Sequence, residues 1–295
     1  MGRNAVGNRH PGAVCVYILC VLLPVVFGMN PVTAGMGMLS GLMLLGLTQN
    51  GFPGKELAWA LGIVAFSGIL NPVFNHNGQT VLFFLNRNPV TLEALLYGLV
   101  MGMMIASALL WGRCFSRMMD TDRMMCVLGR LSPKVSLILS MTLRYIPLMR
   151  TQAGRVREAQ TGLGLIREEN GLDRVKGAVR VFDGMVTWGL ENGITMADSM
   201  TARGYGTGRR TRYELYPWEK ADTALTAASL SILAMTLGAH AAGWIGYTWY
   251  PALTTPELSP RTVGAYAVFG LLCMGSSVLE ALDRIHWKRL RDRAF

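Results

Sequence analysis

Charged residues are scarce in this 295-residue sequence. Asp, Glu, Lys and Arg make up only 16% of it, against roughly 25% in an ordinary soluble domain. Apolar side chains make up 51%, and the mean hydropathy is +0.33. This balance excludes an ordinary soluble enzyme, and it also excludes a disordered chain, which carries few apolar and aromatic residues. We therefore expect the apolar side chains to be buried in lipid.

Motifs of known chemistry are also missing. The sequence has no G-x-x-x-x-G-K-[ST] phosphate loop, no H-E-x-x-H motif and no G-x-S-x-G elbow. Its five cysteines include no C-x-x-C pair, which favours free thiols. Its four histidines lie far apart in the sequence. We expect His240, inside an apolar run, to make an interhelical hydrogen bond, with a proton relay as the alternative. The sequence thus predicts no catalytic residue and no metal site.

Six apolar runs are candidates to cross a membrane. Two lie between Gly12 and Gly54, where no residue is charged. The other four lie at Leu57–Pro72, Ala94–Gly112, Ala224–Thr255 and Thr262–Val278. At about 1.5 Å per helical residue, runs of roughly 17 to 25 residues cross a hydrocarbon core about 30 Å thick. The first run also resembles a signal peptide, but a second run follows at once, as in a membrane hairpin.

Basic residues gather on one side of the expected membrane. The formal net charge is +10, and with the N-terminus inside only Arg87 and Arg261 of the 28 Lys and Arg residues fall in outer loops. The positive-inside rule therefore places both termini in the cytoplasm. The basic residues follow this topology and do not form one groove with stacking aromatics, so we expect the partner to be a lipid bilayer and not a nucleic acid.

The fold class that follows is an all-α polytopic membrane protein with about six transmembrane helices. The segment from Arg113 to Lys220 carries 29 of the 46 charges, which is typical of a cytoplasmic domain. The expected parts are about four transmembrane helices in 13–112, the cytoplasmic domain in 113–220, about two more transmembrane helices in 221–283 and a cytoplasmic tail in 284–295.

Two long helices are predicted inside the cytoplasmic domain. The first begins at Ser132-Pro133, an N-cap followed by proline in the first turn, and ends at Gly162 or Gly164. The second runs from near Asp173 to Gly204. Each could extend about 45 Å, so we expect two antiparallel arms, the first kinked at Pro147. A seventh span over 137–149 is the alternative for the first arm.

Both arms carry a helical stripe of apolar or weakly polar residues at steps of three or four. In the first arm these are Val135, Leu139, Thr142, Ile146, Met149, Ala153 and Val156. In the second they are Val175, Val179, Phe182, Val186, Leu190, Ile194 and Ala197. Each stripe lies on one face of its helix, and the other faces of the first arm carry basic residues.

The second arm ends in a short motif, Ala202-Arg203-Gly204, which follows Ala-Asp-Ser-Met. Three other short segments support the same comparison: Arg144-Tyr145-Ile146-Pro147, Arg157-Glu158-Ala159-Gln160 and Asn71-Pro72-Val73-Phe74-Asn75. With these segments the sequence resembles, over nearly its whole length, the membrane-embedded T component of energy-coupling factor (ECF) transporters, the CbiQ-type family. Cytoplasmic arms that end in Ala-Arg-Gly motifs characterise that family.

The resemblance implies a coupling subunit of an importer in the bacterial cell membrane. Such a subunit is not an enzyme and holds no cofactor. It binds two ABC-type ATPases, which hold ATP and Mg, and one small membrane subunit that captures a vitamin or a transition-metal ion. By the same resemblance the ATPase-coupling residues are Ala202, Arg203 and Gly204 on the second arm and Gly162, Leu163 and Gly164 on the first. Leu163 stands where the family has arginine.

Paired methionines mark a second candidate surface. Met118, Met119, Met124 and Met125 lie on the linker into the arms. Flexible thioethers suit an adaptable surface, so these four are candidates for contact with the substrate-capturing subunit; plain filling between helices is the alternative.

Two other functions stay open from the sequence. One is a self-sufficient carrier driven by an ion gradient, although the interiors of the expected spans lack acidic residues. The other is a membrane enzyme, although the Asp198, Arg203 and Tyr205 group is too sparse to specify a reaction.

Overall fold

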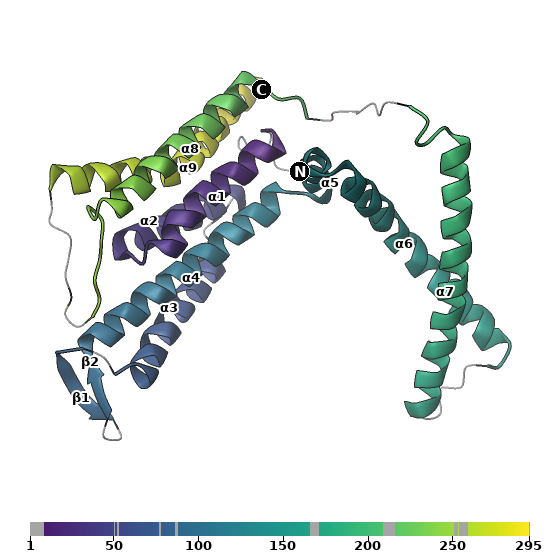
Figure 1. Ribbon diagram of the computed structural model, residues 1–295, viewed down its shortest axis with the longest axis horizontal. Helices are drawn as coiled ribbons and strands as arrows, with labels where there is room; N and C mark the ends of the chain where they lie inside the picture. Colours follow the sequence, from purple (N-terminus) through teal and green to yellow (C-terminus); the bar gives the residue numbers. More distant parts are fainter. Residues whose placement is uncertain are drawn as a thin grey trace. The chain divides into compact units, whose positions relative to one another are not determined.

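The computed structural model describes residues 9–49, 51, 53–76, 78–85, 88–165, 171–208, 216–250, 253 and 259–294. Within these ranges the chain forms nine helices and one two-stranded hairpin (Figure 1). The elements are α1 (Pro11–Phe27), α2 (Pro31–Gln49), α3 (Gly54–Phe74), β1 (Val81–Leu85), β2 (Asn88–Thr91), α4 (Leu92–Met118), α5 (Thr121–Leu131), α6 (Pro133–Gly162), α7 (Gly171–Ala202), α8 (Lys220–Ala241) and α9 (Pro260–Ala294). They fall into two compact units, Met1–Met124 with Tyr216–Phe295, and Met125–Leu215.

The first unit contains the helices that can cross a membrane. By length and composition, five of its described helices qualify: α2, α3, α4, α8 and α9 over Pro260–Ile285. The remaining apolar helix, α1, has 17 residues, or about 26 Å at the usual helical rise. An all-α membrane fold is therefore confirmed, with five long spans and one shorter apolar helix where six spans are predicted.

These helices pack in a defined order. In the first unit α3 packs on α4, α4 on α2 and α1, α2 on α9, and α1 on α8. The outer face of α3 stays exposed at Trp59, Phe66 and Ile69, as expected of side chains that face lipid.

Small residues allow α2 and α4 to approach closely. A Cβ added at Gly37 would lie 2.6 Å from Ser107 Oγ, and one at Gly41 would lie 3.2 Å from the Leu110 Cβ. The indole of Trp111 is fully buried there and donates to the Gly37 carbonyl at 3.0 Å. Close backbone approach at small residues is the usual basis of helix packing in lipid, where the hydrophobic effect does not drive helices together.

Buried polar side chains link helices that are far apart in the sequence. The Tyr17 hydroxyl of α1 donates to the Leu272 carbonyl of α9 at 2.6 Å. The Asn30 side chain is fully buried and donates both to the Ile245 carbonyl at 3.0 Å and to the Tyr266 hydroxyl at 2.7 Å. These bonds join the first part of the chain to α9 and to the turn that follows α8.

Two features of the first unit differ from the sequence prediction. The hairpin β1–β2 is antiparallel, with Val81 opposite Thr91, whereas the prediction has no strand. The span predicted over Ala224–Thr255 ends as a helix at Ala241. The reason is Gly243, whose φ of +73° turns the chain out of the helix.

The second unit contains the two arms. The helix α6 begins at Pro133 and ends at Gly162, as predicted, and α7 covers Gly171–Ala202 against a prediction of 173–203. Helix α6 runs through Pro147 without interruption. Ser132 is the N-cap by position, but its side chain makes no capping hydrogen bond, so only the backbone part of the predicted start is confirmed.

The contact between α3 and α4 gives a test of the packing. A Cβ at Gly102 would lie 2.7 Å from the Val64 Cα, whereas one at Gly112 on the same helix has open space. We predict that Gly102→Ala lowers the free energy of unfolding by about 1–3 kcal/mol, the usual cost of overpacking. Gly112→Ala, the matched control, should not lower it. Thermal unfolding in detergent, followed by tryptophan fluorescence, measures both, and equal stability of the two variants would contradict the packing.

Candidate coupling site at the arm ends

The first arm ends in a tight turn around a left-handed glycine. Gly164 has a φ of +69°, a conformation that glycine adopts readily and other residues avoid. Its amide donates to the Thr161 carbonyl at 2.9 Å, and the Leu165 amide donates to the Gln160 carbonyl at 3.0 Å. These two bonds form a Schellman motif, in which Leu163 is the C-cap residue.

The second arm ends in the same motif. Gly204 has a φ of +82°, and its amide donates to the Thr201 carbonyl at 2.9 Å. The Tyr205 amide donates to the Met200 carbonyl at 3.0 Å. Arg203 therefore holds in α7 the position that Leu163 holds in α6. The two sequence motifs, Gly162-Leu163-Gly164 and Ala202-Arg203-Gly204, are structurally equivalent.

The backbone of these turns is not unique to the arms, because α8 ends in the same way at Gly243. What distinguishes the arm ends is the C-cap side chain. Leu163 is 74% exposed and Arg203 is also exposed. Each arm thus ends in an ordered turn that presents one side chain to the surroundings, an apolar one on α6 and a cationic one on α7.

Contacts between the arms hold the end of the first arm in place. Helices α6 and α7 cross (Figure 1), with Tyr145 and Trp188 ring centroids 6.4 Å apart. The Arg180 guanidinium of α7 donates to the Leu165 carbonyl at 2.6 Å, next to the α6 turn. The Gln160 side chain donates to the Arg180 carbonyl at 3.3 Å. The first arm end is therefore fastened to the second arm.

The apolar stripe of α7 lies on the side of the helix away from α6. Helix α6 contacts α7 near Gly184, where Val156 is close, and Gly189, where Met149 is close. The stripe residues are 43–69% exposed: Val175, Val179, Phe182, Val186, Leu190 and Ile194. Small residues of α7 allow the contact with α6, and the stripe is an open apolar surface of the second unit.

A hollow of about 460 Å³ opens between the C-terminal half of α6 and the first turns of α7. Its lining residues are Ala153, Gly154, Arg157, Arg174, Gly177, Ala178 and Val181. Two guanidinium groups, those of Arg157 and Arg174, are among these lining residues. The sequence alone does not predict this hollow, because it depends on how the two arms cross.

The four candidate methionines have different surroundings. Met118 and Met119, at the end of α4, are 3% and 8% exposed. Met124 of α5 is 41% exposed, and Met125 is half-buried. The Arg123 guanidinium donates to the Met118 carbonyl at 2.9 Å and closes the end of α4. An accessible surface is therefore present at the second pair, while the first pair lies inside the first unit.

Three acidic side chains are buried among the described residues of the first unit: Glu93, Asp222 and Glu280. Glu280 lies inside α9, whereas the other two lie at helix starts. Glu93 and Asp222 are 3% and 1% exposed and lie in the first turns of α4 and α8. Glu93 accepts from the Thr80 hydroxyl at 2.7 Å, and Asp222 accepts from two backbone amides, those of His10 and Glu219. The Asp222 bonds are those of a helix cap, whereas the Glu93 bond ties the start of α4 to Thr80 before the hairpin.

The predicted hydrogen bond of His240 is not made by its Nε2 atom. This atom is buried and has no hydrogen-bond partner among the described residues. Its neighbour is Gly28, where an added Cβ would lie 2.8 Å away. Among the described residues, no three His, Cys, Asp or Glu side chains are grouped so that they could hold a metal ion.

A bundle of apolar helices joined to a unit of two long, mostly exposed helices defines a multi-pass membrane protein with a separate helical domain. The model of the CbiQ family, described as cobalt transport protein, matches residues 5–214. This range includes both arm-end motifs. Because it covers more than half of the chain, the protein belongs to the CbiQ family, and the resemblance found in the sequence is confirmed.

Individual relatives agree with this assignment. The energy-coupling factor transporter transmembrane protein EcfT of Streptococcus equi subsp. equi (strain 4047) is 25% identical over 236 residues, which are 75% of this chain and 87% of the relative. The protein of the same name from Streptococcus thermophilus is 26% identical over 258 residues, 79% and 95% of the two chains. EcfT 1 of Listeria monocytogenes is 32% identical over 101 residues, which are 34% of this chain and 37% of the relative.

Proposed function

We propose that this protein is the transmembrane coupling subunit of an ECF-type importer. In this role it binds two ABC-type ATPases at its arm ends, with the arms in the cytoplasm, and passes their ATP-driven motion to a small membrane subunit that captures a vitamin or a transition-metal ion. The ATPases supply the ATP and Mg sites. Membership of the CbiQ family and the names of the relatives support the transporter class.

The observation that carries the coupling role is the equivalence of the two arm ends. Two ATPases of related fold would require two contacts of related geometry. The chain offers two Schellman turns with Leu163 and Arg203 in the same exposed position. Residues Gly162, Gly164, Ala202 and Gly204 shape these turns.

The side chains of the two turns suit different contacts. A guanidinium offers five donors in a planar fork and binds carboxylates or carbonyl groups in two directions, so Arg203 suits a polar joint. Leu163 suits an apolar pocket. Arg157 of the first arm and Arg174 of the second arm line the hollow between the arms.

The arms are suited to transmitting displacement. Helices of 30 and 32 residues reach about 45–48 Å. They cross with ring and hydrogen-bond contacts, so a push on one end moves both helices. Helices of this length pass motion over a distance that flexible loops would absorb.

The surface proposed for the substrate-capturing subunit is the methionine region. The exposure of Met124 supports the second pair as the contact, whereas Met118 and Met119 are buried within the first unit. Thioether side chains adapt to several partners, which would allow one coupling subunit to serve more than one capturing subunit.

An ion-coupled carrier remains the alternative function. Carriers of that kind use titratable groups along a path through the membrane. Asp222 makes the hydrogen bonds of a helix cap, and Glu93 is bound to Thr80 at the start of α4. Glu280, buried within α9, is the described acidic side chain that such a path would use.

Charge reversal at the second arm end tests the proposal. We predict that Arg203→Glu weakens binding of an ATPase at least tenfold, about 1.4 kcal/mol, and abolishes uptake, while membrane insertion is unchanged. Co-purification with the tagged chain and uptake into cells measure this. Arg155→Glu, at an exposed position on α6, is the matched control and should bind normally. Normal binding and uptake by the Arg203 variant would contradict the proposal.

Substitution at the first arm end tests the apolar contact. Leu163→Asp should weaken ATPase binding by roughly 1–3 kcal/mol, because a charge would enter an apolar pocket. Leu163→Arg, which introduces the residue found in the family, should retain binding. The same co-purification, titrated with ATPase, gives both values. Binding by the Asp variant at the wild-type level would exclude Leu163 from the contact.

A further inference from the structure

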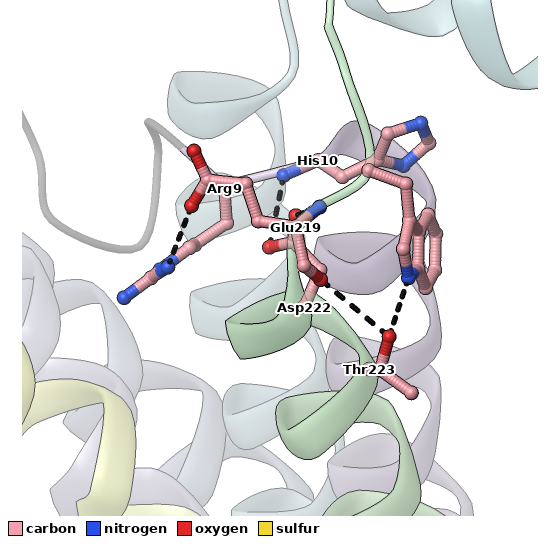
Figure 2. Close-up of polar contacts among 6 residues, drawn as sticks. Arg9, His10, Glu219, Asp222 and Thr223 are labelled. Carbon is pink, nitrogen blue, oxygen red and sulfur yellow. Dashed lines mark hydrogen bonds and ion pairs between the residues drawn. The ribbon is translucent and has the colours of Figure 1, made fainter.

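Helices α1 and α8 begin side by side and are joined by a set of polar contacts (Figure 2). Arg9 and Glu219 form an ion pair with their nearest atoms, Nη1 and Oε2, 3.6 Å apart. The rings of His10 and Trp218 have centroids 4.6 Å apart, and the Trp218 indole donates to the Thr223 hydroxyl at 2.7 Å. Residues 9–10 and 216–223 are thus held together although more than two hundred positions separate them in the chain.

One carboxylate serves the starts of both helices. Asp222 is 1% exposed; its Oδ1 accepts from the His10 amide at 3.3 Å, and its Oδ2 accepts from the Glu219 amide at 3.1 Å. Glu219 and Asp222 form a capping box for α8. The His10 ring caps α1, since its Nδ1 accepts from the Gly12 amide at 3.0 Å. An ionised carboxylate is well placed here because the N-terminal ends of two helices carry positive partial charge.

The position of this cluster in the chain suits a role beyond helix capping. Helix α8 is the first described helix after the second arm, α7. Any displacement that leaves α7 along the chain reaches residues 216–219 before it reaches a membrane helix. At that point Asp222 fastens the chain to the start of α1, which packs on α2, α4 and α8 in the first unit.

We infer that Asp222 is a positioning residue of the coupling step: its shared carboxylate transmits displacement of the second arm to α1 as well as to α8. This inference rests on the proposed function. Without the shared carboxylate, motion would reach α1 only through its packing on α8 and the surface contacts of Arg9 and Trp218, and the helices that pack on α1 would follow it less.

The substitution Asp222→Asn tests this inference. The amide keeps the size of the side chain but offers one acceptor oxygen and a donor nitrogen, so one of the two amides, that of His10 or that of Glu219, loses its acceptor. We expect the variant to bind both ATPases at wild-type levels and to hydrolyse ATP within twofold of the wild type. Uptake per ATP hydrolysed should fall at least tenfold. A merely structural cap would reduce assembly and hydrolysis together with uptake.

The matched control is Asp173→Asn. Asp173 is the third residue of α7, as Asp222 is of α8, and the control should leave the ratio of uptake to hydrolysis unchanged. A wild-type ratio in the Asp222 variant would overturn the inference. The inference would also be overturned if the Asp173 variant showed the same fall in uptake per ATP hydrolysed.

A second measurement uses the wild-type complex and does not depend on the folding of a variant. Amide hydrogen exchange is compared between the nucleotide-free complex and the complex trapped with ATP and vanadate. The inference predicts that exchange changes together at residues 10–14 and 219–223. A change at 219–223 alone would overturn it. Failure of the ATPases to bind at all would instead contradict the proposed function, so the two failures are distinguishable.

Discussion

The unpaired backbone groups at helix ends are the constraint on which this structure depends. A helix leaves its first amides and last carbonyls without partners within the helix, and in this chain the proposed functional features lie where these groups are satisfied. At the C-terminal ends of the arms, Gly164 and Gly204 satisfy carbonyls with left-handed turns. At the N-terminal ends of α1 and α8, Asp222 satisfies amides of both helices. The first arrangement presents side chains outward, and the second ties two helices together.

Helix packing in the first unit is subject to a related constraint. Lipid gives helices no hydrophobic reason to associate, so close contact depends on small residues and on buried hydrogen bonds. Gly37, Gly41 and Gly102 let the backbones approach, and Asn30 and Tyr17 bond across helices. A rigid bundle of this kind is what a transmitted displacement requires, because a loosely packed bundle would dissipate it.

Local signals in the sequence were sufficient to predict the arms. The Ser132-Pro133 start and the glycines after each arm act within one helical turn, so the predicted bounds of α6 agree with the structure. Residues 163 and 203 were predicted as coupling residues from the family resemblance, and the glycine that follows each of them marks the end of its helix. Their structural equivalence required the hydrogen bonds of both turns.

Features that depend on tertiary contacts could not be predicted. Periodicity indicated that the stripe from Val175 to Ile194 is one helical face, but not that Gly184 and Gly189 would face α6 in its place. Composition could not separate the buried Met118 from the exposed Met124. No local pattern links His10 to Asp222, because 212 positions separate them.

The central claim is that the two C-cap side chains are the places where the arms meet the ATPases. The most direct measurement places the photoreactive residue benzoylphenylalanine at position 163, 203 or 151 of the tagged chain, expressed with its ATPases. Position 151 is an exposed site in the middle of α6. The account predicts adducts with an ATPase from positions 163 and 203 and none from 151. No adduct from 163 or 203, or equal adducts from all three, would contradict it.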